Sequence, residues 1–212
     1  MKENLEEYLH SLLPARNGEF AEMEEYAKEH QVPIMEPEGM EALLQILRLQ
    51  NPERILEVGA AIGYSALRMS DALPGTKIVT IERDGERAQL ARENIKKMGK
   101  QEDITLIEGD ALETGEEAGL HMYDAIFIDA AKGQYKRFFE LYEAFLNRDG
   151  IIITDNVLFK GLVARNEEEI EPKRIRNLVR KIKDYNIWLM NHPEYHTVIL
   201  PIGDGVAISK RK

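Results

Sequence analysis

Hydrophobic residues in the first 50 positions recur at the spacing of α-helices. Leu9, Leu12 and Leu13 follow that period until Pro14, a residue that helix interiors do not tolerate. Two further stretches have the same period, which predicts a helical N-terminal part over residues 1–50. Their apolar positions are Phe20, Met23, Tyr26 and Ala27, and then Met40, Leu43, Leu44 and Leu47.

After Pro52 the pattern changes, and short apolar runs alternate with amphipathic stretches. Strands that alternate with helices predict βαβ units and a parallel sheet, and unbroken apolar runs are typical of strands covered on both faces. The expected strands are Arg54–Val58, Lys77–Ile81, Ile104–Ile107, Ala125–Ile128 and Ile151–Thr154. The expected helices between them are Tyr64–Ala72, Glu86–Met98, Ala111–Ala118 and Tyr135–Phe145.

The C-terminal part contains a long charged helix and a pair of strands. The helix is expected over Pro172–Met190. The strands Tyr195–Pro201 and Val206–Ser209 flank Gly203-Asp204-Gly205, a turn that is typical of an antiparallel hairpin.

All of these elements fit one α/β domain over residues 1–212. We expect a mostly parallel, Rossmann-like sheet in residues 51–212 that ends in an antiparallel strand pair. Residues 1–50 are expected to form a helical cap on it. No internal repeat and no linker rich in Pro, Gly or Ser divides the sequence.

The composition excludes several kinds of protein. The 212 residues include no cysteine, which excludes disulfides, thiolate metal sites and a cysteine nucleophile. No apolar run approaches the ~20 residues of a membrane-spanning helix, and the acidic first residues are unlike a signal peptide. We therefore expect a cytoplasmic protein without a membrane partner. The net charge of −10 argues against nonspecific binding of nucleic acid.

Ligands of doubly wound sheets bind at the carboxyl ends of the strands, beside the point where the strand order reverses. The first strand runs into Glu57-x-Gly59-x-x-x-Gly63, and glycine lets a backbone approach a ligand closely. Ala61 stands where a dinucleotide-binding motif needs its second glycine for the pyrophosphate, so a nucleotide without phosphates fits better. A tight turn without any ligand is the alternative.

Acidic residues also follow the second and third strands. Glu82 ends the second strand, where a carboxylate can accept hydrogen bonds from both hydroxyls of a ribose. Asp84 is better placed to cap the following helix. After the third strand, Gly109 and Asp110 could frame an adenine, with Asp110 accepting from the exocyclic amine. A helix N-cap is an alternative role for Asp110 that is compatible with the first.

Oxygen ligands follow the fourth and fifth strands. Asp129 ends the fourth strand, and Asp155 and Asn156 end the fifth. If these strands are neighbours, the three side chains converge, and their oxygens suit magnesium or calcium rather than zinc. The alternative is three polar residues that cap neighbouring helices.

Lys132 lies three residues after Asp129. The charge of a neighbouring cation favours the neutral form of a lysine, which can then act as a general base. A solvated surface lysine is the alternative.

Three segments, LEVGAAIGYSALRM, FIDAAKGQY and ITDNV, resemble the cation-dependent O-methyltransferases of the catechol and caffeoyl-CoA type, which use S-adenosylmethionine. The resemblance covers nearly the whole chain. It implies the class I S-adenosylmethionine-dependent methyltransferase fold and Mg²⁺ or another divalent cation. For the cofactor site it implies Met35, Glu57, Gly59, Ser65, Glu82, Gly109, Asp110, Ala111 and Asp129. For the reacting centre it implies metal ligation by Asp129, Asp155 and Asn156, and catalysis by Lys132 as the base together with Asp129.

A closer resemblance is carried by PIMEPEGMEALLQIL, NVLFKGLVA, IEPKRIRNLV and WLMNHPEYHTVILPIGDGVAISKRK. These segments are similar to the bacterial tRNA 5-hydroxyuridine methyltransferases, which make 5-methoxyuridine at the wobble position. This resemblance implies the anticodon loop of tRNA as the substrate and a homodimer as the assembly.

The acidic net charge is an objection to an RNA substrate, because phosphate contacts need lysine and arginine. The charge is uneven, however, and Lys132 and Lys160 flank the expected site. A basic rim suits a stem-loop whose splayed base enters a pocket, whereas a solvated helix face is the alternative. The basic residues of the expected last helix are Lys173, Arg174, Arg176, Arg180, Lys181 and Lys183.

Two alternatives to a tRNA methyltransferase stay open. A methyltransferase for catechol-like or caffeoyl-CoA-like diols would share every catalytic residue. A noncatalytic nucleotide-binding module would bind the cofactor without metal or methyl transfer, but it leaves Asp129, Asp155 and Asn156 without a role.

Overall fold

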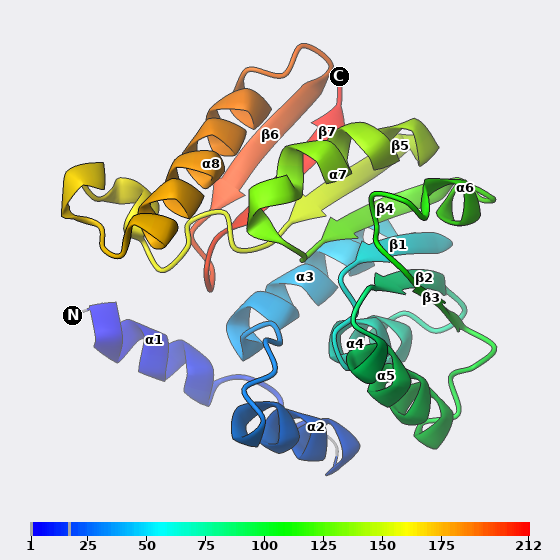
Figure 1. Ribbon diagram of the computed structural model, residues 1–212. Helices are drawn as coiled ribbons and strands as arrows, with labels where there is room; N and C mark the ends of the chain where they lie inside the picture. Colours follow the sequence, from blue (N-terminus) through cyan, green and yellow to red (C-terminus); the bar gives the residue numbers. More distant parts are fainter. Residues whose placement is uncertain (1, 17) are drawn as a thin grey trace.

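The computed structural model describes residues 2–16 and 18–212, and over these residues it forms a seven-stranded sheet (Figure 1). The strands are β1 (Arg54–Val58), β2 (Lys77–Glu82), β3 (Ile104–Glu108), β4 (Tyr123–Ile128), β5 (Leu146–Thr154), β6 (Tyr195–Leu200) and β7 (Val206–Arg211). Their order is β3-β2-β1-β4-β5-β7-β6. The strands β1 to β5 are parallel, and β7 is antiparallel to both β5 and β6. The expected mostly parallel sheet with a terminal antiparallel pair is confirmed.

Helices cover both faces of this sheet. They are α1 (Lys2–Ser11), α2 (Gly18–Glu29), α3 (Pro37–Gln50), α4 (Tyr64–Ala72), α5 (Gly85–Lys97), α6 (Gly115–Ala118), α7 (Tyr135–Tyr142) and α8 (Lys173–Met190). Four 3₁₀ turns among the described residues are Lys132–Gln134, Glu143–Phe145, Leu162–Ala164 and Glu167–Glu169. The helices α2, α3 and α4 pack in one apolar layer, whereas α7 and α8 pack in the other (Figure 1). Within the described ranges, none of the helices combines the length and apolar character needed to cross a membrane.

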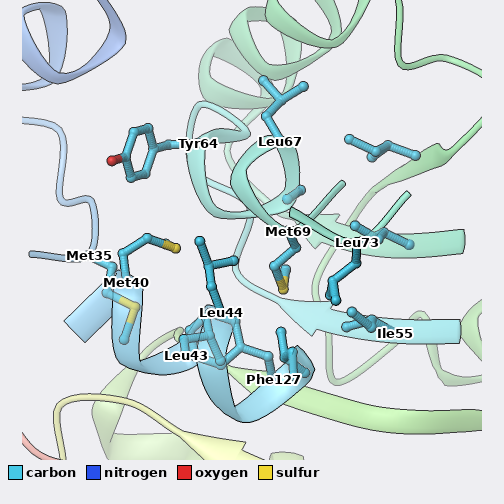
Figure 2. Packing of buried hydrophobic residues seen from close by; sticks show 14 of the residues in the cluster. Met35, Met40, Leu43, Leu44, Ile55, Tyr64, Leu67, Met69, Leu73 and Phe127 are labelled. Atoms are coloured by element: carbon cyan, nitrogen blue, oxygen red, sulfur yellow. The ribbon is translucent and has the colours of Figure 1, made fainter. Parts of the chain in front are cut away.

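Alternation along the strands produces these two layers, because successive side chains of a strand point to opposite faces. Ile55 of β1 and Phe127 of β4 belong to the layer under the N-terminal helices. Figure 2 shows these two with Leu43 and Leu44 of α3. The intervening residues, such as Leu56, pack in the layer under α7 and α8. Alternate residues of each unbroken apolar run therefore belong to different layers.

One expected helix is mostly wrong. Only Gly115–Ala118 of the stretch from Ala111 to Ala118 is helical. The Asp110 carboxylate accepts a hydrogen bond from the Leu112 N–H at 2.9 Å, and the Asp110 carbonyl accepts from the Glu113 N–H at 2.8 Å. An aspartate that bonds its own following backbone favours a turn over a helix.

The apolar layer under α3 generates a prediction about stability. Leu47 is 0% exposed in this layer, whereas Leu49 on the same helix is 80% exposed. We expect Leu47→Ala to lower the free energy of unfolding by about 2–5 kcal/mol, because it leaves a cavity. Leu49→Ala is the matched control and should change it by less than about 0.5 kcal/mol. Urea denaturation measures both, and equal losses would contradict the assigned face of α3.

Candidate active site

A pocket of about 560 Å³ opens at the carboxyl ends of the parallel strands, where the strand order reverses between β1 and β4. This is the place at which such sheets bind ligands. All of the site residues predicted from the sequence line this pocket except Glu57. The lining set comprises Met35, Gly59, Ser65, Glu82, Gly109, Asp110, Ala111, Asp129, Lys132, Asp155 and Asn156.

Gly59 lets the ends of β1 and β4 meet. Its φ is +106°, and a Cβ built on it would lie 2.0 Å from the carbonyl oxygen of Asp129. No side chain fits there, so only glycine permits the contact. The backbone then turns into α4 at Gly63, and Ser65 faces the pocket from the first turn of that helix.

Glu57 lies beneath the pocket wall and not on it. Its side chain is completely buried, and the hydroxyls of Ser65 and Thr80 donate hydrogen bonds to its carboxylate. Burial is the largest cause that raises its pKa, from 4.5 to about 7. Glu57 does not line the pocket, whereas Ser65, which donates to its carboxylate, does, and the contact of Glu57 with the cofactor stays a prediction.

Glu82 keeps the position expected for a ribose acceptor. Its carboxylate accepts from the Ala61 N–H at 2.8 Å and from the Asp84 N–H at 2.9 Å, and it lines the pocket. Each carboxylate oxygen has a second lone pair, so hydroxyls of a ligand can still bind. Asp84 caps α5 as expected, since its side chain accepts from the N–H groups of Glu86 and Arg87.

The carboxylates of Asp129 and Asp155 lie at the other end of the pocket. Burial raises the pKa of Asp129, and burial followed by the charge of Asp129 raises the pKa of Asp155 to about 7. The Tyr135 hydroxyl donates to the Asp155 carbonyl at 2.9 Å, which fixes the end of β5. Two neighbouring carboxylates repel each other, so a cation between them is favourable.

Asn156 completes the oxygen set. Its φ is +61°, its amide donates to the Asp155 carboxylate, and its carbonyl oxygen accepts a hydrogen bond from the Lys132 ammonium. No group of three or more His, Cys, Asp or Glu side chains suited to a metal occurs among the described residues. Two carboxylates and one amide oxygen, with room for water and ligand oxygens, fit Mg²⁺ well.

Three further residues line the pocket near Asp129 and Asp155. They are Phe159 and Lys160, which follow β5, and Asp204, which precedes β7. The ring of Phe159 lies 5.9 Å from the Lys132 Nζ. Asp204 was recognised in the sequence only as a turn residue. Its position in the sequence could have indicated a place in the site, because β7 is antiparallel to β5 and so begins where β5 ends.

The basic face of α8 is smaller than expected. Arg176 pairs with Glu171, and Arg180 and Lys183 both pair with Glu167. The other three basic residues make no ion pair within the described part of the chain: Lys173, Arg174 and Lys181. Lys181 lies beside Gly133, next to the pocket.

Comparison with known proteins identifies the family. A family described as O-methyltransferase matches residues 15–212. The chain belongs to this O-methyltransferase family. A flavonoid 3′,5′-methyltransferase of Vitis vinifera is 34% identical over 78% of this chain and 73% of its own. A caffeoyl-CoA O-methyltransferase of Populus kitakamiensis is 32% identical over 80% and 74%.

Solved structures agree with the fold of this methyltransferase. A Staphylococcus aureus protein, provisionally named a caffeoyl-CoA O-methyltransferase, has a TM-score of 0.92 and 38% identity over 97% of this chain and 98% of its own. A SAH-bound methyltransferase of Podospora anserina has a TM-score of 0.87 and 26% identity over 100% and 95%. The class I methyltransferase fold is thus confirmed, and the chain is an S-adenosylmethionine-dependent O-methyltransferase of the caffeoyl-CoA type.

The buried carboxyl of Glu57 generates a prediction about pH. Its pKa is about 7 in the folded chain against 4.5 as the ordinary value, so the folded state holds a proton that the unfolded state releases. The contribution of this carboxyl to the free energy of unfolding is fully present below pH 4.5 and is lost as the pH rises to about 7. The loss amounts to roughly 3 kcal/mol.

Glu57→Gln removes this titration, so we expect the stability difference between the wild type and this variant to change over that window. Glu25→Gln, at an exposed position of α2, is the control and should track the wild type. Urea denaturation between pH 4 and 8 measures the difference. If the difference in free energy of unfolding between the wild type and Glu57→Gln stayed constant over this range, the carboxyl would not be protonated in the folded chain as expected.

Proposed function

We propose that this methyltransferase depends on a divalent cation and methylates one of two adjacent oxygens on a planar ring, with 5-hydroxyuridine of tRNA as its acceptor. The observation that carries the reaction class is the convergence of Asp129, Asp155, Asn156 and Lys132 at one end of the cofactor pocket. A cation held there makes a coordinated hydroxyl more acidic. The 5-hydroxyl and O4 of 5-hydroxyuridine are such a pair of oxygens.

The residues of the chain then have distinct tasks. Glu82 and Asp110 would hold the nucleoside end of S-adenosylmethionine, and Asp129 lines the same pocket. The charge of a cation at Asp129 and Asp155 would favour the neutral amine of Lys132. In that form the Lys132 Nζ, which is hydrogen-bonded to Asn156 and lies over Phe159, accepts the proton of the acceptor hydroxyl. The methyl–sulfur bond breaks as the methyl–oxygen bond forms, so that S-adenosylhomocysteine leaves. Positioning of the reactants supplies most of the acceleration.

Basic side chains around the pocket support an RNA acceptor. Lys160 and Arg83 line the pocket and are exposed, and Arg87 lines it from α5. Lys181 adds a charge without an ion pair in the described chain. An uncharged base could stack on Phe159 while these side chains meet phosphates.

A small phenolic diol is a second candidate acceptor, and the comparisons favour it. The relatives named above act, by their names, on flavonoids and on caffeoyl-CoA. The ion pairs of Arg176, Arg180 and Lys183 also reduce the charge available for RNA.

One assay separates the two acceptors. The protein is incubated with labelled S-adenosylmethionine and Mg²⁺, and either tRNA carrying 5-hydroxyuridine or catechol is added, each with an EDTA control. We expect label in the tRNA, found as 5-methoxyuridine by nucleoside mass spectrometry and lost in EDTA. Label only in catechol would replace the tRNA acceptor by a diol, and full activity in EDTA would refute the metal.

Charge reversal adds an independent test of the RNA surface. Lys173→Glu with Lys181→Glu should raise the KM for tRNA about tenfold or more, because phosphate contacts are lost. The matched control is Lys28→Glu with Arg148→Glu, which changes the same charge at exposed positions outside the pocket lining. Equal effects of the two pairs would speak against a specific tRNA surface on α8.

The role of Lys132 generates a further prediction. Lys132→Ala should lower kcat by roughly 10²–10⁴-fold, the usual contribution of a general base. Affinity for S-adenosylhomocysteine, measured by calorimetry, should stay within about twofold, because the proton acceptor is not needed for cofactor binding. Lys136→Ala, an exposed lysine one helical turn away, serves as the control. A parallel loss of cofactor affinity would contradict the role of base.

A further inference from the structure

The segment after Asn156 gives four consecutive backbone N–H groups to two residues of the turn before β7. The Val157 N–H donates to the Gly205 carbonyl at 3.0 Å. The N–H groups of Leu158 and Phe159 donate to the Asp204 carbonyl at 2.8 and 3.2 Å. The Lys160 N–H donates to the Asp204 carboxylate at 3.1 Å. Asp204 alone thus receives three donors of the loop that carries Phe159 and Lys160.

This loop has a backbone that needs such support. Asn156, Phe159 and Lys160 have φ values of +61°, +44° and +54°. Residues with a side chain occupy the left-handed region at a cost, so surrounding contacts must hold them there. The hydrogen bonds to Asp204 fall directly on Phe159 and Lys160.

Gly205 lets the turn lie directly on the loop. Its φ is +91°, and a Cβ built on it would lie 2.8 Å from the Leu158 nitrogen and 2.3 Å from the Leu158 Cγ. Gly203 lies at the opposite side of the turn, where a Cβ would be 3.7 Å from the Gly39 Cα at the start of α3. The turn therefore fits between the loop and the helical cap.

The residues so held face the acceptor end of the pocket. Phe159 and Lys160 line it, and the Phe159 ring lies 5.9 Å from the Lys132 Nζ. A shift of the loop would move this ring relative to the proton acceptor. The cofactor end, formed by Glu82 and Gly109, has no contact with the loop through these bonds.

We infer that Asp204 is a positioning residue for the acceptor: it holds the segment 157–160 so that Phe159 and Lys160 face the ring that is methylated. This inference rests on the proposed methyl transfer. The side chain contributes one bond, to the Lys160 N–H, while the carbonyl contributes two. A change of the side chain thus removes one bond and leaves the others in place.

Three variants test this inference. Asp204→Ala removes the acceptor for the Lys160 N–H, and Asp204→Asn keeps an oxygen that can accept it. Asp71→Ala removes an exposed carboxylate of α4 that does not line the pocket, and it serves as the control. Amide hydrogen exchange of peptides spanning residues 156–161, without any acceptor, reports on the loop itself.

We expect faster exchange in Asp204→Ala alone, and near wild-type exchange in Asp204→Asn and Asp71→Ala. In the methyl-transfer assay, kcat/KM for the acceptor should fall roughly ten- to hundredfold in Asp204→Ala, as expected for a displaced reactant. The KM for S-adenosylmethionine should stay within about twofold. The Asn variant should restore acceptor kinetics.

Unchanged exchange in Asp204→Ala would overturn the inference, and so would an Asn variant that behaves like the Ala variant. An equal rise of both KM values would also overturn it, because a general loss of structure affects both ends of the pocket. If the wild type transfers no methyl to either acceptor, the proposed function fails. The exchange measurement still decides whether Asp204 holds the loop.

Discussion

The contact between Gly59 and the Asp129 carbonyl is the constraint on which the site depends. A Cβ at position 59 would lie 2.0 Å from that oxygen, so the loop after β1 passes against the end of β4 with no space between them. Because of this contact, Ser65 at the start of α4 and Asp129 at the end of β4 line one pocket. The end of the pocket at Glu82 and the end at Asp155 are therefore two parts of one cavity.

Much of this arrangement could be predicted from the sequence, because the relevant signals are local. Apolar runs locate β1 to β5, and the polar residue directly after each run falls at the same edge of a parallel sheet. That rule predicts Glu82, Asp129 and Asp155 at one edge of the sheet, and all three line one pocket. The resemblance to known methyltransferases then supplied Met35, which lies in the connection between α2 and α3 and has no such local signal.

Other features depend on tertiary contacts and were out of reach. Glu57 belongs to the glycine-rich motif, but Ser65 and Thr80 donate to its carboxylate, and only the tertiary structure shows that it lies behind the residues that line the pocket. The helical period of Ala111–Ala118 was misleading, because Asp110 bonds the following backbone. The spacing of the basic residues in α8 did not show that Glu167 and Glu171, from the preceding segment, form ion pairs with three of the six.

The order β5-β7-β6 has a consequence for how this chain is made. The strand β7 lies between two strands that precede it in the sequence, so during synthesis β5 and β6 emerge before the strand that joins them. Until then β5 presents an open hydrogen-bonding edge, which other chains can also pair with. The N–H groups of the loop at Phe159 likewise gain their acceptors only when Asp204 and Gly205 arrive. The strands β1 to β3, with Glu82 at the end of β2, therefore emerge well before the turn that supports the loop at Phe159.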